Sequence, residues 1–396
     1  MKFCLLLFVL TVSGPSFSAT WQVNLDGSGD FGQMQEAVEF AASGDTIELG
    51  PGRHDSWFIF GEAIQYPTRA LIEGKDLVIL GSSDGETIIG PVNHYEDNPW
   101  HHGIVVGDSS RVVIKNIVFE NLYTAIINFD NCTFLIEDCQ FLNFKNTIMV
   151  MGGETQLNNC YFSTNIEGGI QVLSIDQNYL GIANCSFRWT DDETQGRSTF
   201  IGIQGTVEVQ IASSEFQGAD AGITTDFNPN VTIMNCSFSR NKVVCYAGWG
   251  GARLHFSGCS FSEQERVIFN QDEGMLLKMD DCVIQDTEIV PFSVLYILKG
   301  SYVHNSILEK GARGVVLYHP HVSGEKSAPK SGPVRTIFDM TNNYWGTTEG
   351  DSIQAWIEDA NDDPDILYFV DWSPFWDQQV PTEKSTLQGI KSFFRQ

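Results

Sequence analysis

The chain has 396 residues, and its 50 acidic residues against 23 basic ones give a net charge of −27 at pH 7. Such an acidic surface repels phosphate backbones and anionic membranes, so nucleic acid is excluded as a partner, and anionic polysaccharide is disfavoured unless a cation bridges. The length suffices for two or three ordinary domains or for one elongated domain.

The first 19 residues, MKFCLLLFVLTVSGPSFSA, have the layout of a cleavable signal peptide. One lysine precedes an apolar run of about ten residues and small residues follow, which places the cleavage near residues 18–20. No later stretch reaches the ~18 uninterrupted apolar residues that a membrane span needs. We therefore expect an exported protein without a membrane span, either secreted, periplasmic or at the cell surface.

The next segment, DGSGDFGQMQEAVEFAASGDTIELGPG at 26–52, predicts a helix followed by a strand over 46–49. Asp30 is the expected N-cap of the helix and Gly44 its expected stop. The expected apolar face of the helix consists of Met34, Ala37, Val38 and Ala41. We expect residues 20–44 to cap the first strands of a repetitive fold.

A six-residue pattern then recurs ten times along the chain. It reads IKNIVF at 114, IEDCQF at 136, LNNCYF at 157, IANCSF at 182, IASSEF at 211, IMNCSF at 233, FSGCSF at 256, MDDCVI at 279, VHNSIL at 303 and MTNNYW at 340. Most steps are 21 to 25 residues long, and the longer steps, 185 to 214 and 306 to 343, mark insertions. A unit this short cannot bury its own apolar face, so the units must stack.

Each unit predicts one turn of a parallel β-coil with three short strands. The third position is mostly Asn, Asp, Ser or Gly, which accept left-handed backbone and therefore favour a tight corner. Equivalent residues of successive turns then lie about 4.8 Å apart and form ladders. The expected ladders are Phe119, Phe141, Phe162, Phe187, Phe216, Phe238 and Phe261 inside, and Asn116, Asn159, Asn184, Asn235, Asn305 and Asn342 at the corner. We expect about twelve turns over residues 45–345.

The fourth position of the pattern is often cysteine, but Ile117, Ser214, Ser306 and Asn343 also occupy it. The position therefore favours a small or apolar inward side chain and does not require a thiol. Neighbouring turns keep their Cβ atoms farther apart than the ~3.8 Å that a relaxed disulfide prefers. We expect eight buried free thiols, and we exclude zinc because no CxxC or Cys-His pair occurs.

The end of the repeats, NNYWGTTEGDSIQAWIEDANDDPD at 342–365, predicts a short helix around 353–357 within a C-terminal cap over 346–380, and a tail follows at 381–396. Oxygen ligands alternate as in a calcium loop at Asp359, Asn361, Asp363 and Asp365. Pro364 and Val370 stand where an EF-hand needs Gly and Glu, so an EF-hand is excluded. A looser calcium site and a plain acidic loop both stay open, and no cofactor is required.

The two end segments and the ladders between them resemble a known family. DGSGDFGQMQEAVEFAASGDTIELGPG looks like the entry segment of pectinesterases and pectate-lyase-like proteins, and NNYWGTTEGDSIQAWIEDANDDPD looks like the end of bacterial right-handed parallel β-helix repeat proteins. The resemblance covers nearly all of residues 20–380. It implies an all-β fold, a single-stranded right-handed parallel β-helix of the pectin lyase-like superfamily. The superfamily includes lyases, hydrolases, esterases and members without known chemistry, so the resemblance implies no activity.

The catalytic segments of those enzymes are not found in this sequence. No DFIFG-like or LGRPW-like segment supplies the aspartates and arginine of a pectinesterase, and the NTD, GHG and RIK segments of polygalacturonases are absent. Pectate-lyase chemistry requires a basic residue near a calcium-binding carboxylate cluster, and none of the eleven arginines belongs to such a group.

One column of residues is a candidate glycan site. Ten residues before the fourth position of four successive units stand Gln204, Asp226, Trp249 and Asp272. In register, Asp226 and Asp272 would lie about 9.6 Å apart with Trp249 between them, a spacing that suits an inverting glycosidase and an aromatic ring that stacks on sugars. The same segments also read as plain turns. Both readings stay open, and we retain the four residues as glycan-binding candidates, with Asp226 and Asp272 also as catalytic candidates.

Two loops complete the candidates. The insertion after residue 187 carries Trp189 and several charged residues, which either bind glycan or are simply solvated. The PWHH stretch at 99–102 is expected to be a surface loop, because neighbouring histidines in an extended strand point to opposite sides.

The sequence favours an exported protein that binds a polysaccharide or cell-surface glycan, or that serves as a structural component of the surface or envelope. The alternative is a polysaccharide-degrading enzyme, either a lyase or a glycoside hydrolase. We expect a glycan on the first strands near residues 204–272 rather than on the asparagine corner, whose side chains would bond to one another. The oligomeric state is left open.

Overall fold

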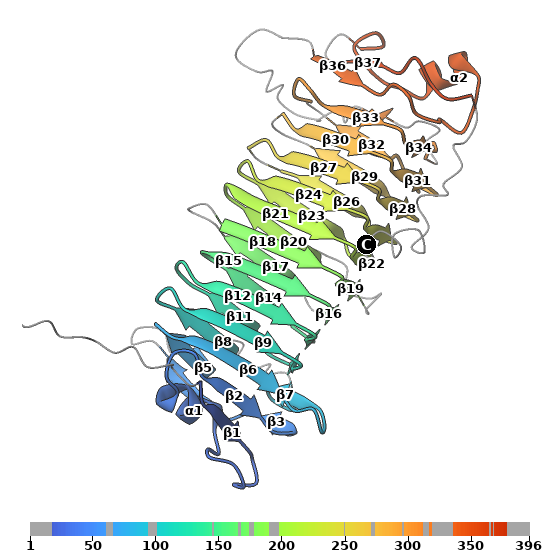
Figure 1. Cartoon of the computed structure of the whole chain (residues 1–396). Coiled ribbons are helices and arrows are strands. Elements are labelled where there is room, and N and C mark those ends of the chain that lie inside the picture. The colour runs from blue at the N-terminus through green and yellow to red at the C-terminus, as the bar shows by residue number, and fades with distance from the viewer. Residues whose placement is uncertain are drawn as a thin grey trace, which may run out of the picture.

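Three parallel sheets run side by side along an elongated molecule, because each turn of the chain contributes one short strand to each sheet (Figure 1). The structure is a computed structural model that describes residues 18–60, 66–93, 101–144, 146–164, 168–173, 178–189, 198–248, 250–270, 274–294, 297–311, 317–318, 336–363, 366 and 368–377. Within these residues the sheets have 14, 12 and 11 strands, which confirms the expected β-coil. The predicted signal peptide lies almost wholly outside the described residues.

The 14-stranded sheet holds the second strand of each turn, directly before the corner. Inward and outward side chains alternate along its strands, as the period of two requires. Its strands, in spatial order, are β1 (Thr20–Val23), β2 (Thr46–Leu49), β6 (Asp76–Gly81), β9 (Arg111–Lys115), β12 (Thr133–Glu137), β15 (Glu154–Asn158), β18 (Asn178–Ala183), β21 (Val207–Ala212), β24 (Asn230–Met234), β27 (Arg253–Ser257), β30 (Leu276–Asp280), β33 (Tyr302–His304), β36 (Thr336–Asp339) and β37 (Tyr368–Asp371).

The 11-stranded sheet follows the corner and carries the phenylalanine ladder. Neighbouring rings are stacked with centroids 4.4 to 5.4 Å apart from Phe119 to Phe261, which confirms the predicted inner ladder. Its strands are β3 (Gly52–His54), β7 (Thr87–Ile89), β10 (Val118–Glu120), β13 (Gln140–Leu142), β16 (Tyr161–Thr164), β19 (Ser186–Trp189), β22 (Glu215–Gln217), β25 (Ser237–Ser239), β28 (Ser260–Ser262), β31 (Val283–Gln285) and β34 (Ile307–Leu308).

The 12-stranded sheet holds the first strand of each turn and starts with an antiparallel hairpin. Its strands are β4 (Phe58–Phe60), β5 (Tyr66–Glu73), β8 (His102–Gly107), β11 (Thr124–Asn128), β14 (Asn146–Val150), β17 (Gly168–Leu173), β20 (Thr199–Gln204), β23 (Ala221–Asp226), β26 (Val243–Ala247), β29 (Arg266–Asn270), β32 (Phe292–Val294) and β35 (Leu317–Tyr318).

The corner between the 14- and 11-stranded sheets is a single residue in the left-handed region, with φ near +55° at Asn116, Asn159, Asn184 and Asn235. This confirms the tight corner. The expected continuous bonding of corner asparagines to one another is wrong, because Asp138, Ser213, Gly258 and Asp281 occupy the corner in other turns. Asn159 instead donates to Asp138 Oδ1 at 2.5 Å, and Asn116 donates to a backbone carbonyl.

The residue after the corner donates a hydrogen bond to the carbonyl two residues before it. Cys139 Sγ lies 3.2 Å from the Glu137 oxygen, and Ser214 Oγ and Ser306 Oγ make the same contact at 2.9 and 2.8 Å. A small side chain that can donate fits this contact, which explains why both Cys and Ser occur at this position. The eight described cysteines are free and buried, as expected.

Helices α1 (Met34–Phe40) and α2 (Gly350–Ala355) belong to the two caps. The expected apolar face of α1 is buried. The predicted N-cap is wrong: Gln33 precedes the helix, and the Asp30 carboxylate instead accepts a bond from the Gln22 backbone N–H at 2.9 Å. Helix α2 begins and ends a few residues earlier than predicted.

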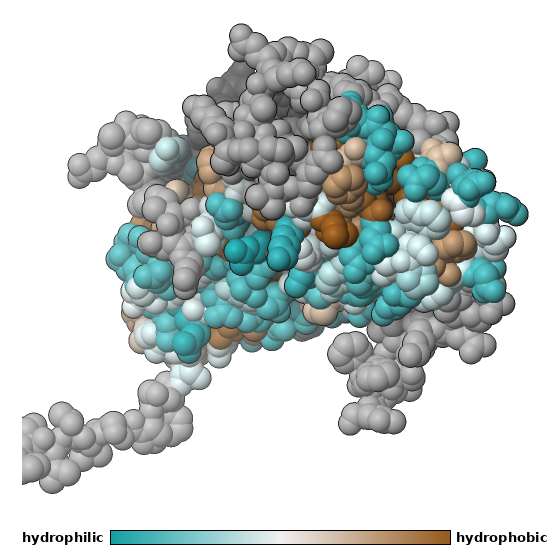
Figure 2. All heavy atoms as spheres, turned by 90° about the horizontal axis from the view of Figure 1, so that it is seen from above, coloured by the Kyte–Doolittle hydropathy of each residue, from teal (hydrophilic) through white to brown (hydrophobic). Residues whose placement is uncertain are grey.

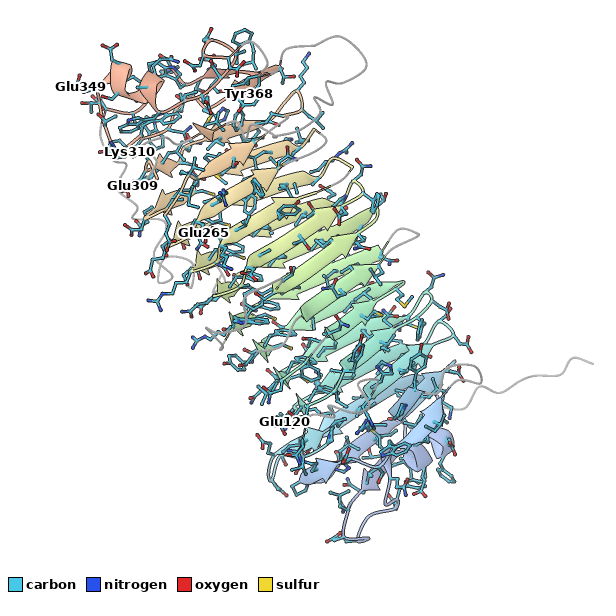
Figure 3. The ribbon with its side chains drawn as sticks, turned by 180° about the vertical axis from the view of Figure 1, so that it is seen from behind. Glu120, Glu265, Glu309, Lys310, Glu349 and Tyr368 are labelled. Carbon is cyan, nitrogen blue, oxygen red and sulfur yellow. The ribbon has the colours of Figure 1, made fainter. Side chains whose placement is uncertain are left out.

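Seen from above the view of Figure 1, the described surface is mostly hydrophilic, with hydrophobic residues in separate groups (Figure 2). Glu120, Glu265 and Glu309 lie along one edge of the molecule (Figure 3). No helix among the described residues has the length and apolar character of a membrane span.

Candidate functional site

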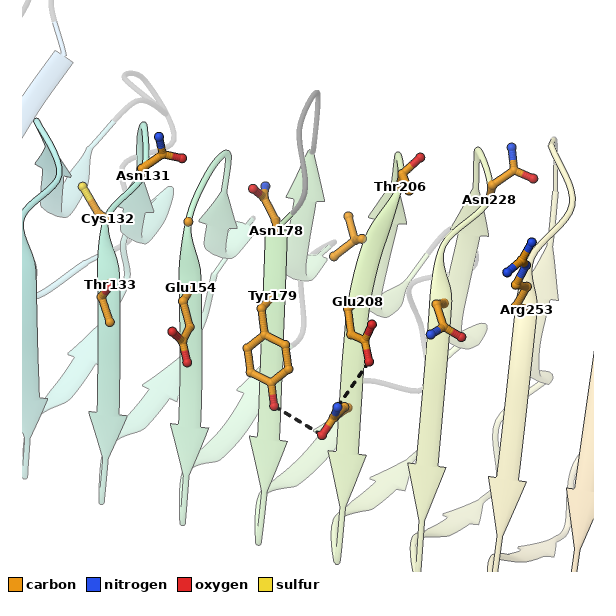
Figure 4. Close-up of a pocket in the computed structure, with 14 residues that line it drawn as sticks. Asn131, Cys132, Thr133, Glu154, Asn178, Tyr179, Thr206, Glu208, Asn228 and Arg253 are labelled. Atoms are coloured by element: carbon orange, nitrogen blue, oxygen red, sulfur yellow. Dashed lines mark hydrogen bonds between the residues drawn. The ribbon is translucent and has the colours of Figure 1, made fainter.

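A groove crosses the outer face of the 14-stranded sheet near the middle of the molecule (Figure 4). Its larger part has a volume of about 850 Å³, and a smaller part of about 290 Å³ adjoins it, with Tyr179 and Gln210 lining both. We call this hollow the Tyr179 groove. The residues that define it are Glu154, Tyr179, Gly181, Glu208, Gln210 and Arg253.

Strand register places the charged and polar residues of the groove in one row. Because every second side chain points outward, the first outward residue of each strand lies beside its equivalents in the next turns. The paired residues, in order along the molecule, are Arg111, Thr133, Glu154, Tyr179, Glu208, Asn230 and Arg253. Within this stretch an aromatic ring stands at the centre with a carboxylate on each side, and an arginine lies three turns away in each direction. The register continues to Asp76 beyond Arg111 and to Leu276 beyond Arg253.

The Tyr179 ring lies flat over Gly181, the next outward residue of β18. A Cβ atom at position 181 would lie 3.1 Å from both Cε1 and Oη of Tyr179, so any larger residue would displace the ring. The Tyr179 hydroxyl donates to Gln210 Oε1 at 3.4 Å, and Gln210 Nε2 donates to Glu208 Oε1 at 3.3 Å. The ring is therefore held from one side and presents a face to the groove.

The flanking carboxylates make the centre of the groove electronegative. Gln156 Nε2 donates to Glu154 Oε1 at 2.5 Å, which fixes that carboxylate on the other side of the ring from Glu208. Burial raises the pKa of Tyr179, and the charges of Glu154 and Glu208 raise it further. The smaller part of the groove is lined by the small residues Gly181, Ala183 and Ala212, next to the exposed Met234.

The rim of the groove includes a strained turn. Asn228 lines the groove, and Phe227 before it has φ +65° with 54% of its surface exposed. A bulky residue pays about 1–2 kcal/mol for the left-handed region. Gly250 of the following turn packs closely against Phe227, because a Cβ atom on Gly250 would lie 2.8 Å from the Phe227 Cα atom.

Replacing Phe227 by Asn should stabilise the protein by about 1 kcal/mol, since asparagine tolerates left-handed backbone and the exposed ring contributes little burial. Asn235→Ala, at a corner residue with φ +54°, is the matched variant and should destabilise it by a similar amount. Chemical denaturation measures both. A loss of stability in Phe227→Asn would contradict this prediction, because it would mean that packing of the ring stabilises the turn by more than the left-handed backbone costs.

The sequence-predicted glycan column does not continue in one register. Gln204 pairs with Asp226, as expected. The next pair is Thr225 with Ala247, so Gly248 rather than Trp249 follows opposite Asp226, and a Cβ on Gly248 would collide with Asp226 Oδ1. Counting ten residues back fails here because the turn after this strand varies in length. Trp249 and Asp272 lie outside the described residues.

The other predicted candidates are placed as follows. Trp189 ends β19 and packs partly buried against the core, while residues 190–197 lie outside the described residues. The Asp359 carboxylate is buried and accepts bonds from the N–H groups of Asn361 and Val370, at 2.8 and 2.9 Å, so it fastens its own loop. Asp363 belongs to the same loop, and Asp365 lies outside the described residues. Calcium binding there stays a prediction.

The expected surface loop at 99–102 is wrong for its two histidines, which are both buried. Arg69, only 1% exposed, donates from Nη1 to His101 Nδ1 at 2.9 Å and from Nη2 to Asp55 Oδ1 at 2.6 Å. Burial and the neighbouring positive charges lower the pKa of His101 and of His102 to about 4. The partner Arg69 lies 32 residues earlier, so no local pattern revealed this cluster.

A family model and a curated relative each match part of the chain. A family model described as a right handed beta helix region matches residues 172–322. Pectinesterase 31 of Arabidopsis thaliana is 24% identical over 177 residues, which cover 38% of this chain and 50% of that protein. The chain thus spans about half the length of this curated relative.

Two solved structures are similar over most of their length. Pectate lyase Pel9A has a TM-score of 0.38 at 10% identity, covering 92% of this chain and 90% of its own. Pectin methylesterase from carrot has a TM-score of 0.27 at 12% identity, covering 97% of each chain.

Proposed function

We propose that this parallel β-helix protein, which matches a right handed beta helix family model over residues 172–322, binds an extended carbohydrate polymer along the Tyr179 groove. The observation that carries this proposal is the Tyr179 ring, laid over Gly181 and held between two carboxylates in a continuous polar row. A flat aromatic face with polar groups beside it is the arrangement that stacks on a sugar ring and bonds its hydroxyls.

The row suits a polymer better than a single small molecule. Its members come from seven successive turns, so they repeat at about 4.8 Å along the molecule. The groove is open along this direction and lined by amide and carboxylate groups, including Asn230 and Gln210. A chain of sugars laid along the row would therefore meet one polar side chain after another.

Tyr179→Ala should weaken binding of a polysaccharide by roughly fivefold, since a stacked ring contributes about 1 kcal/mol. Tyr246→Ala is the matched control, because Tyr246 is a half-buried tyrosine facing outward from the 12-stranded sheet. Affinity is measured by calorimetry with oligosaccharides of neutral, amino and uronic acid type, and folding by melting temperature. If Tyr246→Ala weakens binding and Tyr179→Ala does not, the polymer lies on the first strands, where the sequence placed it.

A glycoside hydrolase is the second candidate function. Glu154 and Glu208 belong to strands on either side of β18, so their Cα atoms lie roughly 10 Å apart, near the carboxylate separation of inverting enzymes. Tyr179 stands between them and makes the arrangement better suited to binding than to admitting a water molecule. New reducing ends that disappear in both Glu154→Gln and Glu208→Gln would favour hydrolysis.

Export is part of the proposal. The single lysine, the apolar run and the small residues within the first 19 residues have the layout of a cleavable signal peptide, which supports export. N-terminal sequencing of the protein recovered from outside the cytoplasm tests this proposal. The mature protein should begin near residue 20.

A further inference from the structure

We infer that the Tyr179 groove selects a polymer of amino sugars with free, protonated amines, and this inference rests on the proposed function. It names the ligand class that the centre of the groove fits, in contrast to the uronic acid polymers that the names of the similar pectin enzymes suggest.

The ring of Tyr179 and the carboxylates of Glu154 and Glu208 all favour binding of a cation. The face of a tyrosine ring attracts an ammonium group within about 6 Å of its centre, and a carboxylate accepts a charge-assisted hydrogen bond from the same group. Glu154 and Glu208 pair directly with Tyr179 on either side. An amine on a sugar stacked against the ring would therefore meet two negative groups and a negative ring face.

These two carboxylates are available to a ligand. Each uses Oε1 to accept a bond from a glutamine two residues along its own strand. Among the residues that the structure describes, neither forms an ion pair, whereas Glu137, which lines the smaller part of the groove, is paired with Lys115. The uncompensated negative charge is thus concentrated at the ring.

The two arginines limit the part of the row that favours a cationic ligand. Arg111 and Arg253 each lie three turns from Tyr179, about 14 Å along the row. They repel amines and attract acidic groups, but the Debye length of about 8 Å in physiological salt weakens their effect on a ligand at the ring. A uronic acid polymer would place carboxylates against Glu154 and Glu208, and a neutral polymer would gain only the stacking contact.

The test compares four hexasaccharides by calorimetry at low salt: glucosamine, at a pH where its amines are protonated, N-acetylglucosamine, glucose and galacturonate. The glucosamine hexamer should bind roughly tenfold tighter than the acetylated one, because acetylation removes the charge-assisted bond. Glu208→Gln should weaken its binding roughly tenfold, with Glu154→Gln as an independent repeat. Arg253→Gln should strengthen it by up to about fivefold, because it removes a repulsion. All three side chains are on the outer face, so melting temperatures verify that folding is kept.

The opposite effects of Glu208→Gln and Arg253→Gln on the affinity for the glucosamine hexamer separate this inference from the proposed function. Tighter binding of galacturonate, weakened in Arg253→Gln, would overturn the inference and leave polymer binding in place. Equal binding of glucosamine and N-acetylglucosamine, unchanged in the charge variants but weakened in Tyr179→Ala, would also overturn it. No binding of any hexamer would overturn both.

Discussion

Phe187→Ala should lower the free energy of unfolding by about 4 kcal/mol, the largest effect that we expect of a single substitution in the molecule. Phe187 is fully buried, and its ring is stacked between those of Phe162 and Phe216, with centroids 4.4 and 4.7 Å away. Removing it leaves a cavity in the middle of the ladder and breaks both stacked contacts. In a solenoid each turn is stabilised mainly by its neighbours, so the defect also weakens the adjacent turns.

The neighbouring residue provides the control. Arg188 is exposed on the outer face of the same strand, so Arg188→Ala should change stability by less than about 0.5 kcal/mol. Thermal unfolding followed by circular dichroism compares the two. Equal melting temperatures for the two variants would mean that the phenylalanine ladder does not hold the turns together.

Acidification should destabilise the protein through the His101–His102 cluster. Both histidines have a pKa of about 4 in the folded protein, against an ordinary value of 6.5. Between these values the unfolded chain binds more protons than the folded one, so stability falls as the pH falls from 6.5 to 4. The loss corresponds to about 3 kcal/mol for each histidine. The geometry agrees with this direction, because Arg69 needs His101 Nδ1 as an acceptor and leaves no place for a proton there.

A double variant, His101→Gln with His102→Phe, isolates this effect. Glutamine can still accept from Arg69, which also holds Asp55, and phenylalanine keeps an uncharged ring at position 102, where His102 contacts the rings of Tyr66 and Tyr123. The variant should lose much less stability than the wild type between pH 6.5 and 4, while charge repulsion among the acidic residues changes equally in both. Parallel curves of melting temperature against pH would refute the account. Measurements stop at pH 4 because carboxylates with a lowered pKa, such as Asp45, lose their contribution below it.

The fold was predictable because each turn is stacked on the next in register. The recurrence of Phe119 to Phe261 at the sixth position of the repeated pattern was enough to infer the inner ladder, and the left-handed corner followed from the asparagines. The donor role of the residue after the corner was missed, although the mixture of Cys, Ser and Asn at that position was the signal for it.

The sequence analysis missed the groove because it compared residues ten positions before the fourth position of the repeated pattern, whereas the groove residues lie six positions before it. The residue six positions before the fourth position lies in the second strand of each turn. The register of these residues is unbroken from Arg111 to Arg253. Ten residues before it lies across a turn of variable length, where the register changes after Asp226. The sequence does contain the signal, as Glu154, Tyr179 and Glu208 each stand six residues before it. The flat position of the tyrosine ring over Gly181 is a matter of side-chain packing that the spacing alone does not give.

Hydroxyl-radical footprinting with a bound oligosaccharide tests most directly whether the polymer lies in the Tyr179 groove. Tyr179 and the 39% exposed Met234 line the groove, whereas Tyr246 and the 40% exposed Met151 belong to the side of the 12-stranded sheet. Saturation with the glucosamine hexamer, or with whichever hexamer binds, should slow oxidation of Tyr179 and Met234 several-fold and leave Tyr246 and Met151 unchanged. Protection of Tyr246 and Met151, with Tyr179 oxidised as fast as in the free protein, would contradict the assignment of the groove.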